Sequence, residues 1–236
     1  MSEAATNYSS NNSDASPPQL AVGLPSIKDV KTTLKQPDLP VDVLLVTVKD
    51  CEFLACYNEL KDSYRYYFKD VGSVYFNSVQ SHEVKVALLK FSEGSTGPGS
   101  SLIAMKNAAT ILQPKAVISV GTCSGFNPDK TKLGDVVVSA KLTTYASKVV
   151  ITEQEQSGVW RSYVSRRFVS IITNCADGWL APVKNPEDRL VRVYCNGEFL
   201  SGPEQISAEW RRKKILERHP RGAGVDTEGE GECMSR

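Results

Sequence analysis

Apolar and polar positions alternate along the chain in two patterns, short β-branched runs and longer stretches of helical spacing. The run "VDVLLVTV" (41–48) is typical of a strand that is covered on both faces, as in parallel sheets. It leads directly into "KDCEFLACYNEL" (49–60), where apolar residues recur at helical spacing. We therefore expect a buried strand that is followed at once by a helix.

The rest of the chain repeats this alternation. Residues 73–80 and 83–91 alternate with a period of two and predict a pair of strands. Further expected elements are a helix at 97–114, a buried strand at 115–120, a strand at 136–145, a helix at 160–179, a strand at 189–197, a helix at 203–219 and a last strand at 223–225. The pattern predicts a three-layer α/β/α domain with a central twisted, mixed and mostly parallel sheet.

The first 39 residues differ from the rest in composition. The first 18 are rich in Ser, Asn and Ala and end in two prolines, so they are too polar to offset the entropy of ordering. We expect residues 1–39 to form a disordered N-terminal tail and linker, and residues 40–236 to form one domain.

Charge and cysteine content narrow the function classes. With 28 Lys and Arg against 27 Asp and Glu, the net charge of +1 favours neither nucleic acid nor a membrane as the main partner. Six scattered cysteines without a C-x-x-C pair, and 2 histidines, predict neither a metal site nor a secreted disulfide framework. Without an apolar signal core or an apolar run of about 20 residues, we expect a soluble cytoplasmic protein.

Candidate chemistry gathers where three predicted strands end, the place where ligands bind in open α/β sheets. Asp50 and Glu52 follow the first strand, "GTCSG" (121–125) follows the strand at 115–120, and "DTEGE" (226–230) follows the last strand. Glycines permit close backbone approach, and N–H groups with hydroxyls hold an anion or a sugar hydroxyl. Each feature also has a structural explanation, since tight strand exits need glycine and acids favour the first turn of a helix.

Other readings of these motifs are weaker. No G-x-G-x-x-G follows a strand, and "GSTGPG" (94–99) lacks the G-K-[ST] ending, so a dinucleotide or Walker site is not expected. Cys123 has no histidine in an identifiable partner position and is interpreted as a packing residue. The basic run "WRRKKILERHPR" (210–221) is interpreted as an amphipathic surface helix rather than a nucleic-acid site.

Taken in order, these motifs resemble the nucleoside phosphorylase and nucleosidase superfamily, and within it the methylthioadenosine/S-adenosylhomocysteine nucleosidase-like branch. The similarity spans residues 41 to 236, and its most specific element is "GTCSGF" (121–126) followed by "GDVVVS" (134–139).

The resemblance implies roles for individual residues. Glu52 matches the glutamate that orders the attacking water, and Phe199 matches the aromatic residue that stacks on the purine. Glu228 matches the acid that binds the ribose 2′- and 3′-hydroxyls, and Thr227 stands where a methionine usually packs under the sugar.

The resemblance places Gly121 and Thr122 in the water or phosphate pocket and implies no organic cofactor or metal. Phosphorylases usually carry an arginine where this chain has Ser119, which favours hydrolysis over phosphorolysis because water needs no cationic clamp. The family continues for a further strand and helix with an acid that protonates the purine. The resemblance therefore implies that the nucleoside phosphorylase-like domain of residues 40–236 is C-terminally incomplete.

Together these interpretations predict cleavage of the N-glycosidic bond of a purine nucleoside, by a nucleosidase or a phosphorylase that serves nucleoside catabolism or salvage. The expected partners are a purine nucleoside, phosphate in the case of a phosphorylase, and further copies of the chain in a homo-oligomer. The alternative is a catalytically impaired nucleoside-binding sensor or regulatory module, which the missing C-terminal acid supports.

Overall fold

The computed structural model describes most of the chain from residue 18 onwards. The described residues are 18–26, 28, 36–60, 63–79, 84–91, 100–125, 131–139, 141–145, 148–151, 154–157, 161–185, 191–195, 197–202, 206 and 208–226. Two of the predicted site residues, Thr227 and Glu228, lie outside them.

A first sheet has five strands in the order β2-β3-β4-β1-β5. Its parallel strands β4, β1 and β5 lie side by side, and the antiparallel strands β3 and β2 extend the sheet beyond β4. The bounds are β1 Val43–Thr47, β2 Tyr64–Phe68, β3 Gly72–Val79, β4 Val84–Lys90 and β5 Ala116–Ser119. The predicted first strand, and the predicted pair at 73–80 and 83–91, are confirmed as β1, β3 and β4.

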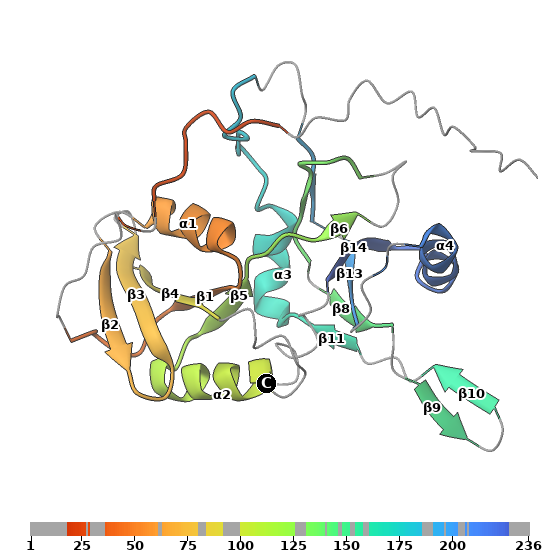
Figure 1. Cartoon of the computed structure of the whole chain (residues 1–236), viewed down its shortest axis with the longest axis horizontal. Coiled ribbons are helices and arrows are strands. Elements are labelled where there is room, and N and C mark those ends of the chain that lie inside the picture. Colours follow the sequence, from red (N-terminus) through yellow and green to blue (C-terminus); the bar gives the residue numbers. More distant parts are fainter. Residues whose placement is uncertain are drawn as a thin grey trace, which may run out of the picture.

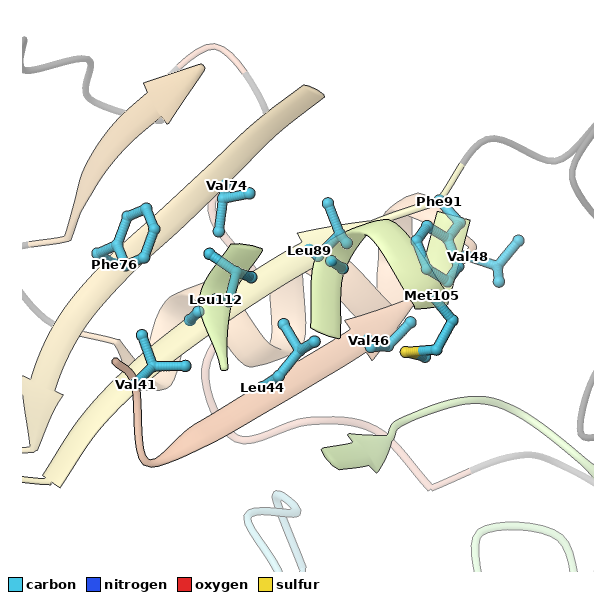
Figure 2. Close-up of a cluster of buried hydrophobic side chains, with 12 residues drawn as sticks. Val41, Leu44, Val46, Val48, Val74, Phe76, Leu89, Phe91, Met105 and Leu112 are labelled. Carbon is cyan, nitrogen blue, oxygen red and sulfur yellow. The ribbon is translucent and has the colours of Figure 1, made fainter. Parts of the chain in front are cut away.

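Helices α1 (Asp50–Glu59) and α2 (Ser100–Leu112) cover opposite faces of this sheet (Figure 1). Successive side chains of β1 point to opposite faces, so Leu44 and Val46 pack toward α2, whereas Val43 and Leu45 pack toward α1. Figure 2 shows Leu44 and Val46 in the same cluster as Met105 and Leu112 of α2. This half of the molecule has the three layers that the sequence predicts.

A second sheet also has five strands, in the order β11-β8-β13-β14-β6. Its centre, β8-β13-β14, is parallel, and both edge strands are antiparallel. The bounds are β6 Ser124–Gly125, β8 Lys141–Thr144, β11 Arg161–Tyr163, β13 Glu198–Ser201 and β14 Gly222–Asp226. Helix α4 (Glu209–Arg218) packs on this sheet through Ile215, which joins Leu200 and Tyr145 in a small core.

Three further units complete the described chain. Helix α3 spans Arg166–Thr173, and the short parallel strands β7 (Val136–Val137) and β12 (Val193–Tyr194) pair with each other. Strands β9 (Lys148–Ile151) and β10 (Gln154–Ser157) form a hairpin that projects away from both sheets (Figure 1). The α/β class with mixed sheets and a parallel centre is thus confirmed, with the described strands divided among two five-stranded sheets and two strand pairs.

Several predicted elements differ from the structure. The single strand expected at 136–145 is divided into β7, which pairs with β12, and β8, which pairs with β11 and β13. After β7, the Ser139 hydroxyl accepts from the Lys141 N–H and donates to the Lys141 carbonyl, so it competes with regular strand hydrogen bonds. The helix expected at 160–179 is confined to α3, since residues 161–163 pair with β8 instead. The helix expected at 203–219 begins only at Glu209, and β12 is much shorter than the strand expected at 189–197.

The strand at 115–120 is present as β5 but is not buried. Val117 is 36% and Ile118 is 48% exposed, because within the described residues β5 is an edge strand that pairs with β1 alone.

Part of the segment predicted to be a disordered tail contacts the domain. Leu20 forms an isolated bridge with Val183, and the Ala21 N–H donates to the carbonyl of Pro182 at 2.9 Å. The boundary between residues 39 and 40 stays a prediction, and residues 1–17 lie outside the described chain.

Candidate functional site

The two large sheets meet at the segment that runs from β5 to β6. Strand β5 is the edge of the first sheet and β6 is the edge of the second, and residues 120–123 connect them. In Figure 1 this segment crosses from one half of the molecule to the other. The connection carries the predicted pocket residues Gly121 and Thr122 at the carboxyl end of β5.

Glu52 lies in the first turn of α1, directly after β1, and its side chain is buried. Its Oε2 accepts hydrogen bonds from the backbone N–H groups of Val48 at 3.2 Å and Lys49 at 2.9 Å. A glutamate at the third helical position commonly reaches back to the N-cap N–H in this way. The two hydrogen bonds to Oε2 are therefore explained by helix capping.

The other oxygen of Glu52 contacts the connection that follows β5. Its Oε1 accepts hydrogen bonds from the Thr122 N–H at 2.9 Å and from the Thr122 hydroxyl at 3.1 Å. A Cβ atom at Gly121 would lie 3.7 Å from the same oxygen, so this glycine also contacts the carboxylate. Glu52 thus joins the carboxyl ends of β1 and β5, and capping does not account for this contact.

The environment keeps Glu52 ionised. Burial alone would raise the pKa of this carboxyl group, but hydrogen bonds from the N–H groups of Lys49, Thr122 and Val48 and from the Thr122 hydroxyl lower its pKa below the ordinary value of 4.5. At neutral pH the group is a carboxylate that can only accept hydrogen bonds.

A lysine that the sequence analysis did not single out completes this group. The Lys49 Nζ donates to the Thr122 hydroxyl oxygen at 2.8 Å, so the same hydroxyl accepts from an ammonium and donates to Glu52. Within the described residues Lys49 forms no ion pair, whereas nearby Lys90 pairs with Asp50. The only signal in the sequence was the position of Lys49 immediately before two candidate acids.

Phe199 lies on the second sheet, beside the same connection. It pairs in register with Gly224 of β14, and a Cβ atom at Gly224 would lie 3.0 Å from the Phe199 ring and 3.0 Å from the Cys123 sulfur. The Phe199 ring and Cys123, the residue after Thr122, therefore both lie next to Gly224. The structure brings Glu52, Gly121 and Thr122 into direct contact and holds Phe199 next to their loop.

A second cluster of buried polar side chains, which the sequence did not predict, surrounds Glu198 at the start of β13. Its Oε1 accepts from the Lys141 Nζ at 2.7 Å and from the Thr143 hydroxyl. Burial would raise the pKa of Glu198, but Lys141 and Thr143 lower it. Burial lowers the pKa of His219 despite the nearby carboxylate, so its 3.9 Å contact with Glu198 is made by a neutral imidazole at neutral pH.

Two further features of the described residues bear on function. No three His, Cys, Asp or Glu side chains among them are grouped as a metal site. No helix in the described part of the chain is both long and apolar enough to cross a membrane.

Several solved structures of nucleosidases share the fold of this chain. The 5′-methylthioadenosine/S-adenosylhomocysteine nucleosidase of Neisseria meningitidis, solved with methylthio-immucillin-A, aligns with a TM-score of 0.63 over 84% of this chain and 79% of that one, at 15% identity. The Streptococcus pneumoniae nucleosidase with 8-aminoadenine gives 0.61 over 83% and 79%, at 16% identity. The futalosine hydrolase of Helicobacter pylori gives 0.62 over 83% and 78%, at 11% identity.

The chain has the nucleoside phosphorylase/nucleosidase fold. The resemblance inferred from the "GTCSGF" and "GDVVVS" motifs is therefore confirmed at the level of this nucleosidase fold. No family model matches the sequence. A curated relative, the Death domain-containing ATP nucleosidase of Amphimedon queenslandica, is 24% identical over 210 residues, which are 81% of this chain. The chain spans 39% of the length of that relative.

Proposed function

We propose that the protein hydrolyses the N-glycosidic bond of a purine nucleoside or nucleotide. The observation that carries this proposal is the ionised Glu52 carboxylate, bonded to Thr122 at the junction that Phe199 also borders. The nucleosidase fold supports it, and the adenine-like ligands of the solved relatives support a purine as the base.

In the proposed reaction, water adds to C1′ of the ribose while the bond from C1′ to the purine breaks. The bond's electron pair leaves with the base, which takes up a proton, and the products are ribose and free purine. Glu52 accepts a hydrogen bond from the water and so increases its nucleophilicity. Of the four donors around this carboxylate, the Thr122 hydroxyl is the one that can rotate away and make room for water.

The remaining predicted residues supply binding in this proposal. Phe199 stacks on the purine ring, an arrangement that tolerates different bases because every base has a π face. Glu228 holds the ribose hydroxyls, and Thr227 packs beside the sugar; both follow β14, which pairs with Phe199's strand.

A phosphorylated purine substrate, such as ATP, is the finer form of the proposal. The curated relative is named an ATP nucleosidase, and Lys49 supplies an ammonium at the junction with two N–H donors beyond the one that contacts Thr122. An ammonium without an ion pair favours a phosphate oxygen over the uncharged end of a nucleoside. We therefore expect ATP to be cleaved with a lower KM than adenosine.

The test is base release from adenosine, methylthioadenosine, S-adenosylhomocysteine and ATP, each with and without inorganic phosphate, followed by chromatography of the free base. Release should not depend on phosphate, because Ser119 stands where phosphorylases carry an arginine. Strict phosphate dependence with ribose 1-phosphate as the product would replace hydrolysis by phosphorolysis.

A nucleoside-binding module without catalysis is the second candidate, and one observation favours it. Protein donors occupy both oxygens of Glu52 with two hydrogen bonds each, which uses the four acceptor positions of a carboxylate. If the Thr122 hydroxyl keeps its hydrogen bond to Glu52, the carboxylate has no acceptor position left for a water molecule and activates none. Nucleotide binding by calorimetry together with no base release from any compound in the panel would establish this candidate.

The proposed setting of this activity is cytoplasmic, in a homo-oligomer whose central unit is the domain of residues 40–236. Light scattering during size-exclusion chromatography tests the assembly. A monomer at the concentrations used for catalysis would remove the homo-oligomer from the proposal.

A further inference from the structure

Two cysteines away from the proposed site lie in contact with each other. Cys175 lies in the turn that follows α3, and Cys195 comes directly after β12. Their sulfur atoms are 3.6 Å apart, within the range of a hydrogen bond between thiols, although 20 residues separate them in the chain. Nothing in the proposed nucleosidase chemistry uses this contact.

We propose that Cys175 and Cys195 form an oxidation site, in which a low-molecular-weight disulfide such as oxidised glutathione converts the two thiols into an intramolecular disulfide. A disulfide bond is about 2.05 Å long, so the two sulfur atoms must approach by roughly 1.5 Å from their contact distance. Both cysteines lie outside helices and strands, and rotation about their side-chain bonds is the movement that the proposal requires.

Exposure gives the two thiols different parts in the reaction. Cys175 is exposed and meets the oxidant first, whereas Cys195 is half-buried and lies ready to attack the product. Cys56 is a contrast within the same chain: it is buried, and burial raises the pKa of its thiol to about 11. A thiol with that pKa carries almost no thiolate at neutral pH and is not expected to react.

With oxidised glutathione the reaction has two steps. The Cys175 thiolate attacks one sulfur of the glutathione disulfide, forms a mixed disulfide and releases one glutathione thiolate. The Cys195 thiolate then attacks the Cys175 sulfur and releases the second glutathione. Two protein thiols are oxidised to one disulfide, and one glutathione disulfide is reduced to two thiols.

Burial, and then the neighbouring Cys195 thiol, raise the pKa of Cys175 above its ordinary value. The thiolate fraction at neutral pH is small, so oxidation should be slow there and faster at mildly alkaline pH. Such behaviour distinguishes this site from catalytic cysteines, whose thiolates are stabilised.

The disulfide would cross-link helix α3, which buries little surface against the rest of the structure. No residue of α3 is buried, and its apolar side chains Val169 and Ile171 are 45% and 61% exposed. A disulfide would join the end of α3 to the segment that leads into β13, where Phe199 lies four residues after Cys195. Oxidation therefore connects α3 to the strand that carries the proposed purine-stacking residue.

The experiment uses the full chain, first reduced and then incubated with oxidised glutathione at neutral and mildly alkaline pH. Peptide mapping by mass spectrometry without reductant should yield a linked peptide that contains Cys175 and Cys195 and is two hydrogen atoms lighter than its parts. Dithiothreitol should reverse it. The cross-linked protein should melt about 5 °C or more above the reduced protein, because the link constrains the unfolded chain.

Cys175→Ser and Cys195→Ser should each abolish the linked peptide and the rise in Tm, and Cys51→Ser is the matched control that should retain both, since Cys51 is an exposed thiol on α1. Separate glutathione adducts on Cys175 and Cys195, or complete alkylation of both after oxidation, would overturn the proposal. The mapping of the wild-type chain decides this even if a variant fails to fold.

Discussion

Replacing Glu52 by glutamine is the sharpest test of what this carboxylate contributes to the fold. The carboxylate accepts four hydrogen bonds, three of them from backbone N–H groups. A glutamine side chain has nearly the same shape but only one oxygen, and its amide N–H groups would face donors. In one orientation of the amide, Glu52→Gln leaves the Val48 and Lys49 N–H groups without an acceptor. In the other it leaves the Thr122 N–H without one, because the Thr122 hydroxyl can rotate and accept from the amide.

The size of the effect follows from the unpaired backbone donors and from the loss of the charge that strengthened the remaining hydrogen bonds. A donor that loses its acceptor in a buried place costs about 1–3 kcal/mol, and one side of this group is open to solvent through the exposed Thr122, so we expect a loss of about 2–4 kcal/mol in the free energy of unfolding. For a chain of this size, 1 kcal/mol corresponds to about 2–4 °C in Tm, so the variant should melt about 4–16 °C lower.

Urea denaturation and thermal melting measure this loss, and Asp50→Asn is the matched control. Asp50 is also an acid in the first turn of α1, but its side chain is 69% exposed and its ion pair with Lys90 should contribute less than about 1 kcal/mol. If Glu52→Gln melts at the same temperature as Asp50→Asn, the four hydrogen bonds do not stabilise the fold and the reasoning fails.

The pKa of Glu52 adds a pH dependence to the same variant. Because its pKa in the folded state lies below 4.5, the carboxylate's contribution is fully present above the unfolded value and is lost as the pH falls through the folded value. The difference in stability between wild type and Glu52→Gln should therefore shrink under acidic conditions. A difference that stays constant down to about pH 3 would contradict this assignment.

Three other variants test the second sheet. Lys141→Met leaves the buried Glu198 carboxylate without its ion pair and should lower the free energy of unfolding by about 2–4 kcal/mol in urea; a loss below about 0.5 kcal/mol would refute it. The pKa of His219 is lowered by burial, so stability should fall as the pH drops below 6.5, and His219→Gln should remove that slope; an unchanged slope in urea titrations would reject this origin. Gly224→Ala places a Cβ atom 3.0 Å from the side chains of Cys123 and Phe199. It should lower the free energy of unfolding by about 1–3 kcal/mol and weaken nucleoside binding in calorimetry. Gly23→Ala is the control, because a Cβ atom there meets nothing within 4 Å. Equal losses of stability and of binding in Gly224→Ala and Gly23→Ala would contradict the close contact at Gly224.

Local patterns in the sequence determined the elements that the core depends on most. A continuous apolar run in residues 41–48, alternation in residues 83–91 and helical spacing in residues 49–60 and 97–114 predicted β1, β4, α1 and α2 close to their observed bounds. These patterns are reliable because each element buries one or both faces in the core, and burial sets the spacing of its apolar residues. The motifs at the ends of β1 and β5 likewise pointed to Glu52, Gly121 and Thr122 through the family resemblance.

Tertiary structure decided the rest, because the decisive partners are far apart in the sequence. The bond from Glu52 to Thr122 spans 70 residues, and that from Thr143 to Glu198 spans 55, so no local pattern marks either. The ammonium of Lys49 and the thiol pair of Cys175 and Cys195 have no local signature either. The short edge strand β6 forms only because a partner strand supplies its hydrogen bonds, which is why the sequence pattern alone did not locate it.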